Sequence, residues 1–189
     1  MKPMTGADFE ARYRREGDPW AYETSAYEHE KYAATLEACG DGPFARALEL
    51  GGSIGVFSAL LAPRCRSLVT IDASPTAVAA ARRRLAGLGA VHTVLGRIPP
   101  DIPSVDYDLV VASEILYYLS PSELDGTLAV IRGSLVAGGR LVAVHWRPAG
   151  PERPFDAAGV HDRLRRLPWL APVTRAGTDD YLLDVLERR

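Results

Sequence analysis

Residues 47–62 read ALELGGSIGVFSALLA. A short apolar run that contains one acid, Glu49, is followed by three glycines within five positions and then by a second apolar run. This order is typical of a strand, a tight loop and a helix. We therefore predict a strand at 46–50 and a helix at 53–62, and we ask which ligand the glycine loop between them holds.

The alternation of strands and helices continues along the chain. Short apolar runs predict further strands, and longer runs that begin at Ser74-Pro75 and at Ser120 with Glu123 predict capped helices. The predicted strands are 67–72, 90–95, 107–113 and 140–146, and the predicted helices are 74–88 and 120–139. This pattern predicts an α/β fold, a Rossmann-like doubly wound sheet that is mostly parallel and carries helices on both faces.

The two ends of the chain differ from this central part. Residues 1–40 contain two helical stretches, 5–16 and 24–39, before any strand. Residues 151–189 contain a helical stretch at 155–167 and then two strands at 172–177 and 180–187. We predict one domain over 1–189, with an N-terminal helical lid at 1–40, a ligand-binding core at 45–150 and a C-terminal helix and strand pair at 151–189.

Composition and charge exclude several classes of function. The 189 residues carry a net charge of -2 and are 47% hydrophobic, so no general attraction to nucleic acid or to anionic lipid is expected. No apolar run has membrane-spanning length, and the first residues lack the apolar segment of a signal peptide, which favours a cytoplasmic location. Two distant cysteines and four scattered histidines predict no metal site.

Three ligands compete for the glycine loop. A phosphate-binding P-loop needs GxxxxGK[ST], which is absent, and a dinucleotide loop needs glycine at the positions of Ser53 and Val56. Glu49 would also be a poor neighbour for a pyrophosphate. S-adenosylmethionine (SAM) has no phosphate and carries an ammonium, which an acid at the end of the first strand suits. Small residues then let the backbone approach the ligand.

A second acid supports an adenosine ligand. Asp72 ends the second predicted strand, where a carboxylate can accept hydrogen bonds from both ribose hydroxyls. NAD enzymes use the same position, so Asp72 does not choose between SAM and NAD. The glycine loop makes the choice for SAM.

The chain at this point resembles a class I SAM-dependent methyltransferase, and most closely the nodulation N-methyltransferase (NodS-like) family, including the members associated with PIG-L-type deacetylases. The resemblance covers nearly the whole chain. The stretches that carry it are GDPWAYETSAYEHEKY (17–32), ALELGGSIGVFSALLA (47–62), IDASPTAV (71–78), YDLVVASEILYYL (107–119), GGRLVAVHWR (138–147) and TDDYLLDVLER (178–188).

The resemblance implies a seven-stranded sheet whose last strand is antiparallel. It implies SAM as cofactor, S-adenosylhomocysteine (SAH) as product, and a small-molecule acceptor, in particular the amine of an amino sugar. A deacetylase acting in the same pathway is an expected partner. The alternatives are an O- or N-methyltransferase of another small natural-product metabolite, and a non-catalytic SAM-binding module. The sequence leaves the oligomeric state open.

Two positions depart from the family pattern. The family usually has cysteine where Gly52 stands. Many relatives also carry an acid after the third strand that binds adenine, whereas this chain has Gly96-Arg97-Ile98 there and Asp101 further on. We expect backbone groups around Arg97 and Ile98, together with packing from Ile98, to hold the adenine instead.

The chemistry needs a nucleophile aligned with the methyl carbon and a group that takes the proton of an amine. Glu114 follows the fourth strand and His145 ends the fifth, so either one is a candidate base, with Glu114 also a candidate for orienting the acceptor. Tyr117, Tyr118 and Trp146 are expected to contact the acceptor. The residues expected to hold SAM are Trp20, Tyr27, Glu49, Gly51, Gly52, Ser53, Gly55, Asp72, Ala73, Arg97, Ile98, Ser113 and Glu114.

Overall fold

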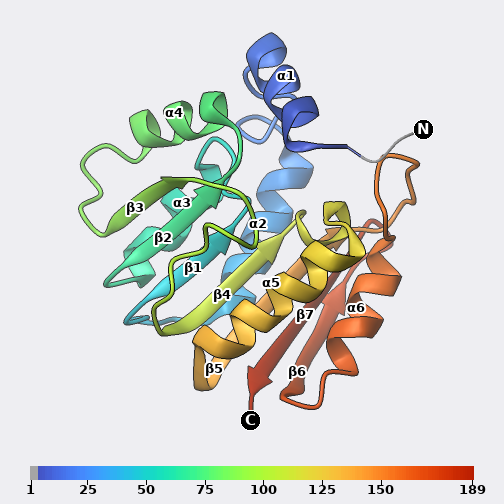
Figure 1. The fold of residues 1–189 in the computed structure, drawn as a ribbon. Helices are drawn as coiled ribbons and strands as arrows, with labels where there is room; N and C mark the ends of the chain where they lie inside the picture. The colour runs from blue at the N-terminus through green and yellow to red at the C-terminus, as the bar shows by residue number, and fades with distance from the viewer. Residues whose placement is uncertain (1–3) are drawn as a thin grey trace.

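The apolar runs form one seven-stranded sheet in the order β3-β2-β1-β4-β5-β7-β6 (Figure 1). The structure is a computed structural model, which describes residues 4–189. The strands are β1 (Ala47–Leu50), β2 (Leu68–Asp72), β3 (Val91–Leu95), β4 (Tyr107–Ser113), β5 (Leu135–Trp146), β6 (Leu170–Gly177) and β7 (Tyr181–Arg188). Strands β1 to β5 pair in parallel, and β7 runs antiparallel to both β5 and β6. The predicted sheet, with its antiparallel last strand, is confirmed.

The helices begin where the sequence places capping residues. Ser74 accepts from the Ala77 amide, and Ser120 and Glu123 form a capping box, so both predicted starts are confirmed. The α-helices are α1 (Gly6–Glu16), α2 (Ala26–Cys39), α3 (Val56–Leu61), α4 (Pro75–Arg84), α5 (Pro121–Ser134) and α6 (Ala157–Arg165). Two short 3₁₀ helices, η1 (Ala62–Arg64) and η2 (Leu116–Tyr118), were not predicted.

Two apolar layers hold the helices on the sheet. One core joins side chains of α5 and α6 to one face of the strands, and another joins α2 and α3 to the opposite face. In parallel strands covered on both sides, both faces are apolar, which explains the nearly continuous hydrophobic runs. Within residues 4–189 no helix has the length and hydropathy to span a membrane.

The predicted helix at 120–139 is wrong at its end. Helix α5 stops at Ser134, and residues 135–139 belong to strand β5, where Leu135 pairs with Tyr107. Gly138 adopts a φ of 76° at a register irregularity between β4 and β5. A positive φ at glycine serves a helix end and a strand irregularity equally well, so the pair Gly138-Gly139 did not distinguish them.

Helix α1 lies beyond the carboxyl ends of the central strands (Figure 1) and is fixed at two sides. The Glu10 carboxylate accepts hydrogen bonds from Ser74 Oγ (2.6 Å) and Thr76 Oγ1 (2.7 Å) at the start of α4. Arg12 forms an ion pair of 3.0 Å with Glu152 in the loop after β5. The N-terminal segment therefore covers the edge of the sheet at which ligands bind in this class of fold.

Gly52 fits a space that a neighbouring threonine limits. A Cβ atom at this position would overlap the Oγ1 atom of Thr70, a buried residue of β2 whose hydroxyl also lies 3.3 Å from Ser58 Oγ. The family's usual cysteine at this position therefore does not fit beside Thr70, and the two residues are matched.

We predict that Gly52→Ala lowers the free energy of unfolding by about 1–3 kcal/mol, the usual cost of overpacking. In the background Thr70→Ala the same change should cost markedly less, because the obstructing hydroxyl is gone. Urea unfolding of the two single variants and the double variant measures the coupling. Strictly additive effects would show that the two side chains do not compete for this space.

Candidate active site

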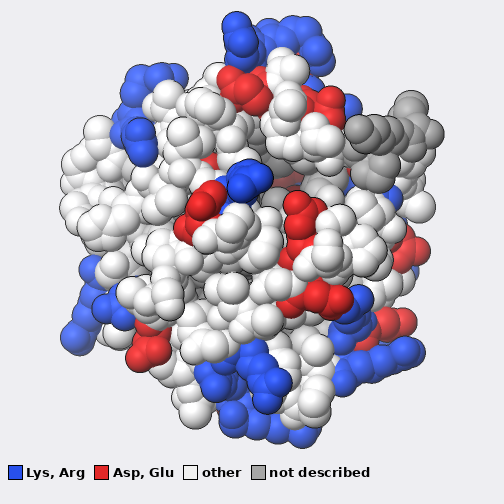
Figure 2. Space-filling view, in the orientation of Figure 1, with Lys and Arg blue, Asp and Glu red and all other residues white. Residues whose placement is uncertain are grey.

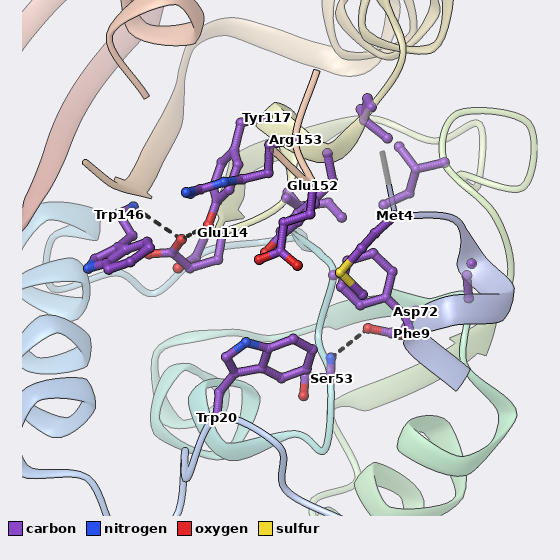
Figure 3. A pocket seen from close by; sticks show the side chains of 18 of the residues that line it. Met4, Phe9, Trp20, Ser53, Asp72, Glu114, Tyr117, Trp146, Glu152 and Arg153 are labelled. Carbon is purple, nitrogen blue, oxygen red and sulfur yellow. Dashed lines mark hydrogen bonds between the residues drawn. The ribbon is translucent and has the colours of Figure 1, made fainter. Parts of the chain in front are cut away.

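A cavity of about 1010 Å³ opens at the carboxyl ends of β1, β2, β4 and β5. The N-terminal segment supplies one wall, including Phe9, Tyr13 and Trp20, and the loops after the strands supply the rest. Figure 3 shows Asp72 and Glu114 on opposite sides of this space, with the Trp20 ring between them. Of the residues predicted to form the site, thirteen line the cavity: Trp20, Tyr27, Gly51, Ser53, Asp72, Ala73, Arg97, Ile98, Ser113, Glu114, Tyr117, Tyr118 and Trp146.

Asp72 forms one end of the cavity. Its carboxylate accepts from the backbone N–H groups of Ser53 and Ser74, both at 2.9 Å. Burial raises the pKa of Asp72, and these amides counter that effect. A carboxylate offers about four acceptor sites, so Asp72 retains capacity for the two hydroxyls of a ribose.

The glycine loop is divided between the cavity and the protein interior. Gly51 and Ser53 line the cavity, and Ser53 holds a φ of 51°, which is unusual for a residue other than glycine. Gly55 begins α3 and faces Ala81 of α4, where an added Cβ would approach to 3.1 Å. Gly55 therefore lies behind the loop, and the absence of a side chain there allows α3 and α4 to pack closely.

Glu49 lies beneath the loop and outside the main cavity. Its carboxylate is 4% exposed and accepts a hydrogen bond from Ser58. A second cavity of about 30 Å³, lined by Glu49, Gly52 and Glu114 among others, lies at this point, and its size suits about one or two water molecules. Burial raises the pKa of Glu49 to about 7.

The loop after β3 holds its own backbone. The Asp101 carboxylate accepts from the Arg97 N–H at 2.8 Å, and the Arg97 carbonyl accepts from the Asp101 N–H at 3.0 Å. The Arg97 amide, which we expected to be available to an adenine, is therefore already bonded. Asp101 lies outside the cavity and holds the shape of this loop, whereas Ile98 lines the cavity.

Glu114 forms the opposite end of the cavity and is held by three donors. Lys31 Nζ donates to Oε1 at 2.8 Å, and Oε2 accepts from the Tyr117 hydroxyl and from the Trp146 N–H at 3.1 Å (Figure 3). Glu114 has a φ of 56°. Positive φ at a residue other than glycine is costly and clusters at functional sites. The carboxylate is thus fixed in place.

Lys31 connects the lid to this carboxylate. Its side chain is 2% exposed, and Nζ lies 3.0 Å from both oxygens of Glu28 as well as close to Glu114. Burial raises the pKa of Glu28, and Lys31 acts against that rise. Two carboxylates and one ammonium give this three-residue cluster a single net negative charge, and the Arg153 guanidinium lies at the same end of the cavity.

The aromatic residues predicted to contact the acceptor gather beside Glu114. Tyr117 stacks on Tyr118 with 4.6 Å between ring centroids. The Arg153 guanidinium lies 4.5 Å from the centre of the Tyr117 ring and 5.2 Å from that of Trp146. Both rings therefore hold the Arg153 guanidinium through cation–π contacts at this end of the cavity.

His145 does not face the cavity. It is fully buried on the side of β5 that packs under η2, and its Nε2 accepts from the Leu116 N–H at 3.2 Å. Burial lowers the pKa of His145 well below its usual range. With Nε2 engaged and Nδ1 bonded to His161 at 3.0 Å, the ring has no nitrogen available to an acceptor. The geometry does not support the interpretation of His145 as a base.

Sequence reasoning missed Glu28, Lys31 and Arg153. Glu28 and Lys31 stand three residues apart on a helix, a spacing that usually marks an exposed ion pair. Their partner Glu114 lies 83 positions from Lys31 in the sequence. Arg153 follows a strand in a proline-rich loop that shows no pattern. Only the predicted lid at 1–40, with Trp20 and Tyr27 among the residues expected to hold SAM, indicated that this segment meets the site.

Three features define a class I SAM-dependent methyltransferase. They are the seven-stranded sheet, the glycine loop between Glu49 and Asp72, and the cavity at the carboxyl ends of the strands. The comparisons with known proteins carry the identification further. The family model of Nodulation protein S (NodS) matches residues 7–149. The chain belongs to the NodS family.

Curated and solved relatives agree with this assignment. Nodulation protein S of Bradyrhizobium diazoefficiens is 38% identical over 103 residues, which are 54% of this chain and 49% of that protein. Nodulation protein S of Rhizobium tropici is 33% identical over 138 residues, 72% of this chain and 58% of that protein. The chain thus spans about half the length of the curated relatives it matches.

One solved structure covers nearly the whole fold. The N-methyltransferase NodS from Bradyrhizobium japonicum, in complex with SAH, superposes with a TM-score of 0.88 and 26% identity over 98% of this chain and 99% of that one. A Burkholderia thailandensis N1-methyltransferase, at 19% identity and a TM-score of 0.77, shares the fold.

The raised pKa of Glu49 predicts that SAH affinity depends on pH. A carboxylate with a pKa near 7 ionises as the pH rises, so its attraction for the SAH ammonium grows in that direction. Between pH 6 and 8 the ionised fraction rises from about a tenth to about nine tenths, so Kd should fall about tenfold. Calorimetric titration at both pH values measures this.

The matched control is Glu49→Gln, in which this part of the pH dependence should disappear. A wild-type Kd that does not change with pH, or a variant that keeps the full change, would contradict a role for Glu49 in binding the ammonium.

Proposed function

We propose that the protein transfers the methyl group of SAM to the amine of a small molecule, an amino sugar, and that Glu114 receives that amine. The observation that carries the proposal is the Glu114 carboxylate, fixed by three donors at the end of the cavity opposite Asp72. The printed name of the solved relative, an N-methyltransferase in complex with SAH, supports transfer to nitrogen.

The chain's residues fit SAM along the length of the cavity. Asp72 would accept from the ribose, Ile98 would pack on the adenine, and Glu49 would attract the ammonium across the small cavity beneath the loop. A volume of about 1010 Å³ is at the upper end for a ligand pocket and accommodates a cofactor together with a small acceptor. When bound, SAM supplies an electrophilic methyl carbon.

Glu114 attracts and orients the acceptor amine. The net negative charge shared by Glu28, Lys31 and Glu114 draws one ammonium group to this end of the cavity. Three donors occupy three of about four acceptor sites of the Glu114 carboxylate, so one site remains for an N–H of the acceptor. An ammonium held there must first pass one proton to the carboxylate, because the nitrogen needs a free lone pair to attack the methyl carbon, and the methylated ammonium can release a further proton afterwards.

The N-terminal segment excludes water from the reacting groups. Phe9 packs edge-on against Tyr118 with 4.9 Å between centroids, and Trp20 packs on Tyr13 and Tyr22. These contacts close the cavity between the two acids, and water exclusion strengthens every electrostatic interaction inside. Trp20 and Tyr27, predicted from the sequence to contact the cofactor, belong to this wall.

The face drawn in Figure 2 carries its basic side chains in separate groups, most of them around the edge and one near the centre beside acidic side chains. A continuous basic groove for a nucleic-acid backbone is not visible on this face. A small acceptor, with its amine exposed by a deacetylase of the same pathway, fits the enclosed cavity better.

The test is methyl transfer from labelled SAM to glucosamine and its short oligomers, with the N-acetylated forms as matched controls. We expect transfer to the free amines and none to the acetylated sugars, because the acetamide nitrogen has no available lone pair. Equal transfer to both forms, or transfer to hydroxyl groups, would contradict the proposal.

We further expect Glu114→Gln to lower turnover by about 100-fold or more, the usual effect of losing a group that handles a proton. SAH Kd should stay within a few-fold, because Asp72 and the loop are untouched. Glu30→Gln, an exposed acid on the same helix as Glu28, is the matched control and should behave like the wild type. Full activity in Glu114→Gln would remove the carboxylate from the mechanism.

A further inference from the structure

Two histidines and an aspartate form a buried chain beneath the acceptor end of the cavity. His145 of β5, His161 of α6 and Asp184 of β7 are each at most 2% exposed. His145 Nδ1 lies 3.0 Å from His161 Nε2, and His161 Nδ1 lies 2.9 Å from Asp184 Oδ2. At the outer end, Arg165 donates to the same Asp184 oxygen at 2.6 Å.

The donors at each end determine the direction of every hydrogen bond in the chain. The Leu116 backbone N–H can only donate, so His145 Nε2 must present a lone pair and Nδ1 carries the proton. His145 Nδ1–H then donates to His161 Nε2, and His161 Nδ1–H donates to the Asp184 carboxylate. Both histidines are therefore neutral and in the Nδ1–H form.

The inner end of the chain holds the turn that carries the acceptor-site residues. Leu116 begins η2, which also contains Tyr117 and Tyr118. The His145 ring meets the Tyr117 ring edge-on with 4.9 Å between centroids, and the Tyr117 hydroxyl donates to Glu114. The chain from Asp184 thus ends two contacts away from the carboxylate proposed to receive the amine.

A polar chain in this position is costly unless every member is bonded. If these residues served packing alone, apolar side chains of similar size would give the same stability without the cost of burying imidazole and carboxylate groups. Here each ring nitrogen and the carboxylate has a partner, so the chain imposes one geometry on the turn. Well-satisfied buried networks of this kind rigidify what they contact.

We propose that His161 and Asp184 are positioning residues that fix the Nδ1–H form of His145, so that His145 holds the Leu116 amide and with it the turn that aligns Tyr117 on Glu114. This inference rests on the proposed role of Glu114. It assigns the histidine at the end of β5 to the support of the site, and it adds two residues that lie outside the cavity.

The first test is independent of the acceptor. In ¹⁵N-labelled protein bound to SAH, we expect His145 and His161 to be neutral with the proton on Nδ1. We also expect a scalar coupling across the hydrogen bond between the Leu116 amide nitrogen and His145 Nε2. A proton on His145 Nε2, or the absence of that coupling in an otherwise assigned spectrum, would overturn the proposal even if methyl transfer is observed.

The second test compares two substitutions of His161. His161→Phe removes both hydrogen bonds, whereas the amide of His161→Gln can accept from His145 and donate to Asp184. We expect His161→Phe to lower kcat/KM for the acceptor by about 10- to 100-fold through misplacement of the turn, with SAH Kd within about threefold. His161→Gln should recover most of that loss and restore the coupling to Leu116.

The outcomes separate this inference from the proposed function. If no amino sugar is methylated, the tautomers and the Leu116 coupling still decide the geometry of the chain. Unchanged acceptor kinetics in His161→Phe, or equal losses in the Phe and Gln variants, would show that the chain does not position the site. Should His161→Phe fail to fold, the Gln variant and the wild-type spectrum remain decisive.

Discussion

A buried ammonium between two carboxylates joins the N-terminal helices of this protein to its sheet. Lys31 Nζ contacts Glu28 on its own helix and Glu114 at the end of β4, and its side chain is nearly inaccessible to water. An unpaired charge there would cost several kcal/mol, so the N-terminal helices and the strand end can hold these groups only together. This contact therefore fixes Glu114 and brings α2 against the end of β4 at the cavity.

The two ends of the cavity use different means for different tasks. At the cofactor end, backbone amides and a glycine loop position Asp72, and the acid beneath the loop acts across a small cavity. At the opposite end, which we propose receives the acceptor, side chains of Lys31, Tyr117 and Arg153 and the backbone N–H of Trp146 converge on Glu114 and Tyr117. The first arrangement is local in sequence and suits a cofactor common to a class. The second is assembled by tertiary structure, and it is where members of a family can differ in substrate.

The parts that the sequence predicted are those whose signals are local. Apolar runs located every strand, and the pattern at the strand ends predicted Gly51, Ser53 and Asp72, which line one end of the cavity. The acceptor side was predicted only in part. His145 and Trp146 are neighbours at a strand end, and alternation sends one into the core and the other toward the cavity. The sequence does not state which face is which, so it predicted His145 as a candidate base, whereas the ring packs away from the cavity. Lys31 had the spacing of a surface ion pair, and its partner 83 positions away appears only when α2 packs against the end of β4.

The most direct test of the central claim is calorimetric titration of the protein with SAH, with NAD⁺ titrated as the control. A cavity that lies between Asp72 and Glu114, with the buried Glu49 beneath its glycine loop, should bind SAH at one site and should not bind NAD⁺, because Glu49 places an acid close to the loop at which a pyrophosphate would bind. Binding of NAD⁺ alone would contradict the assignment of the glycine loop and the methyltransferase chemistry inferred from it.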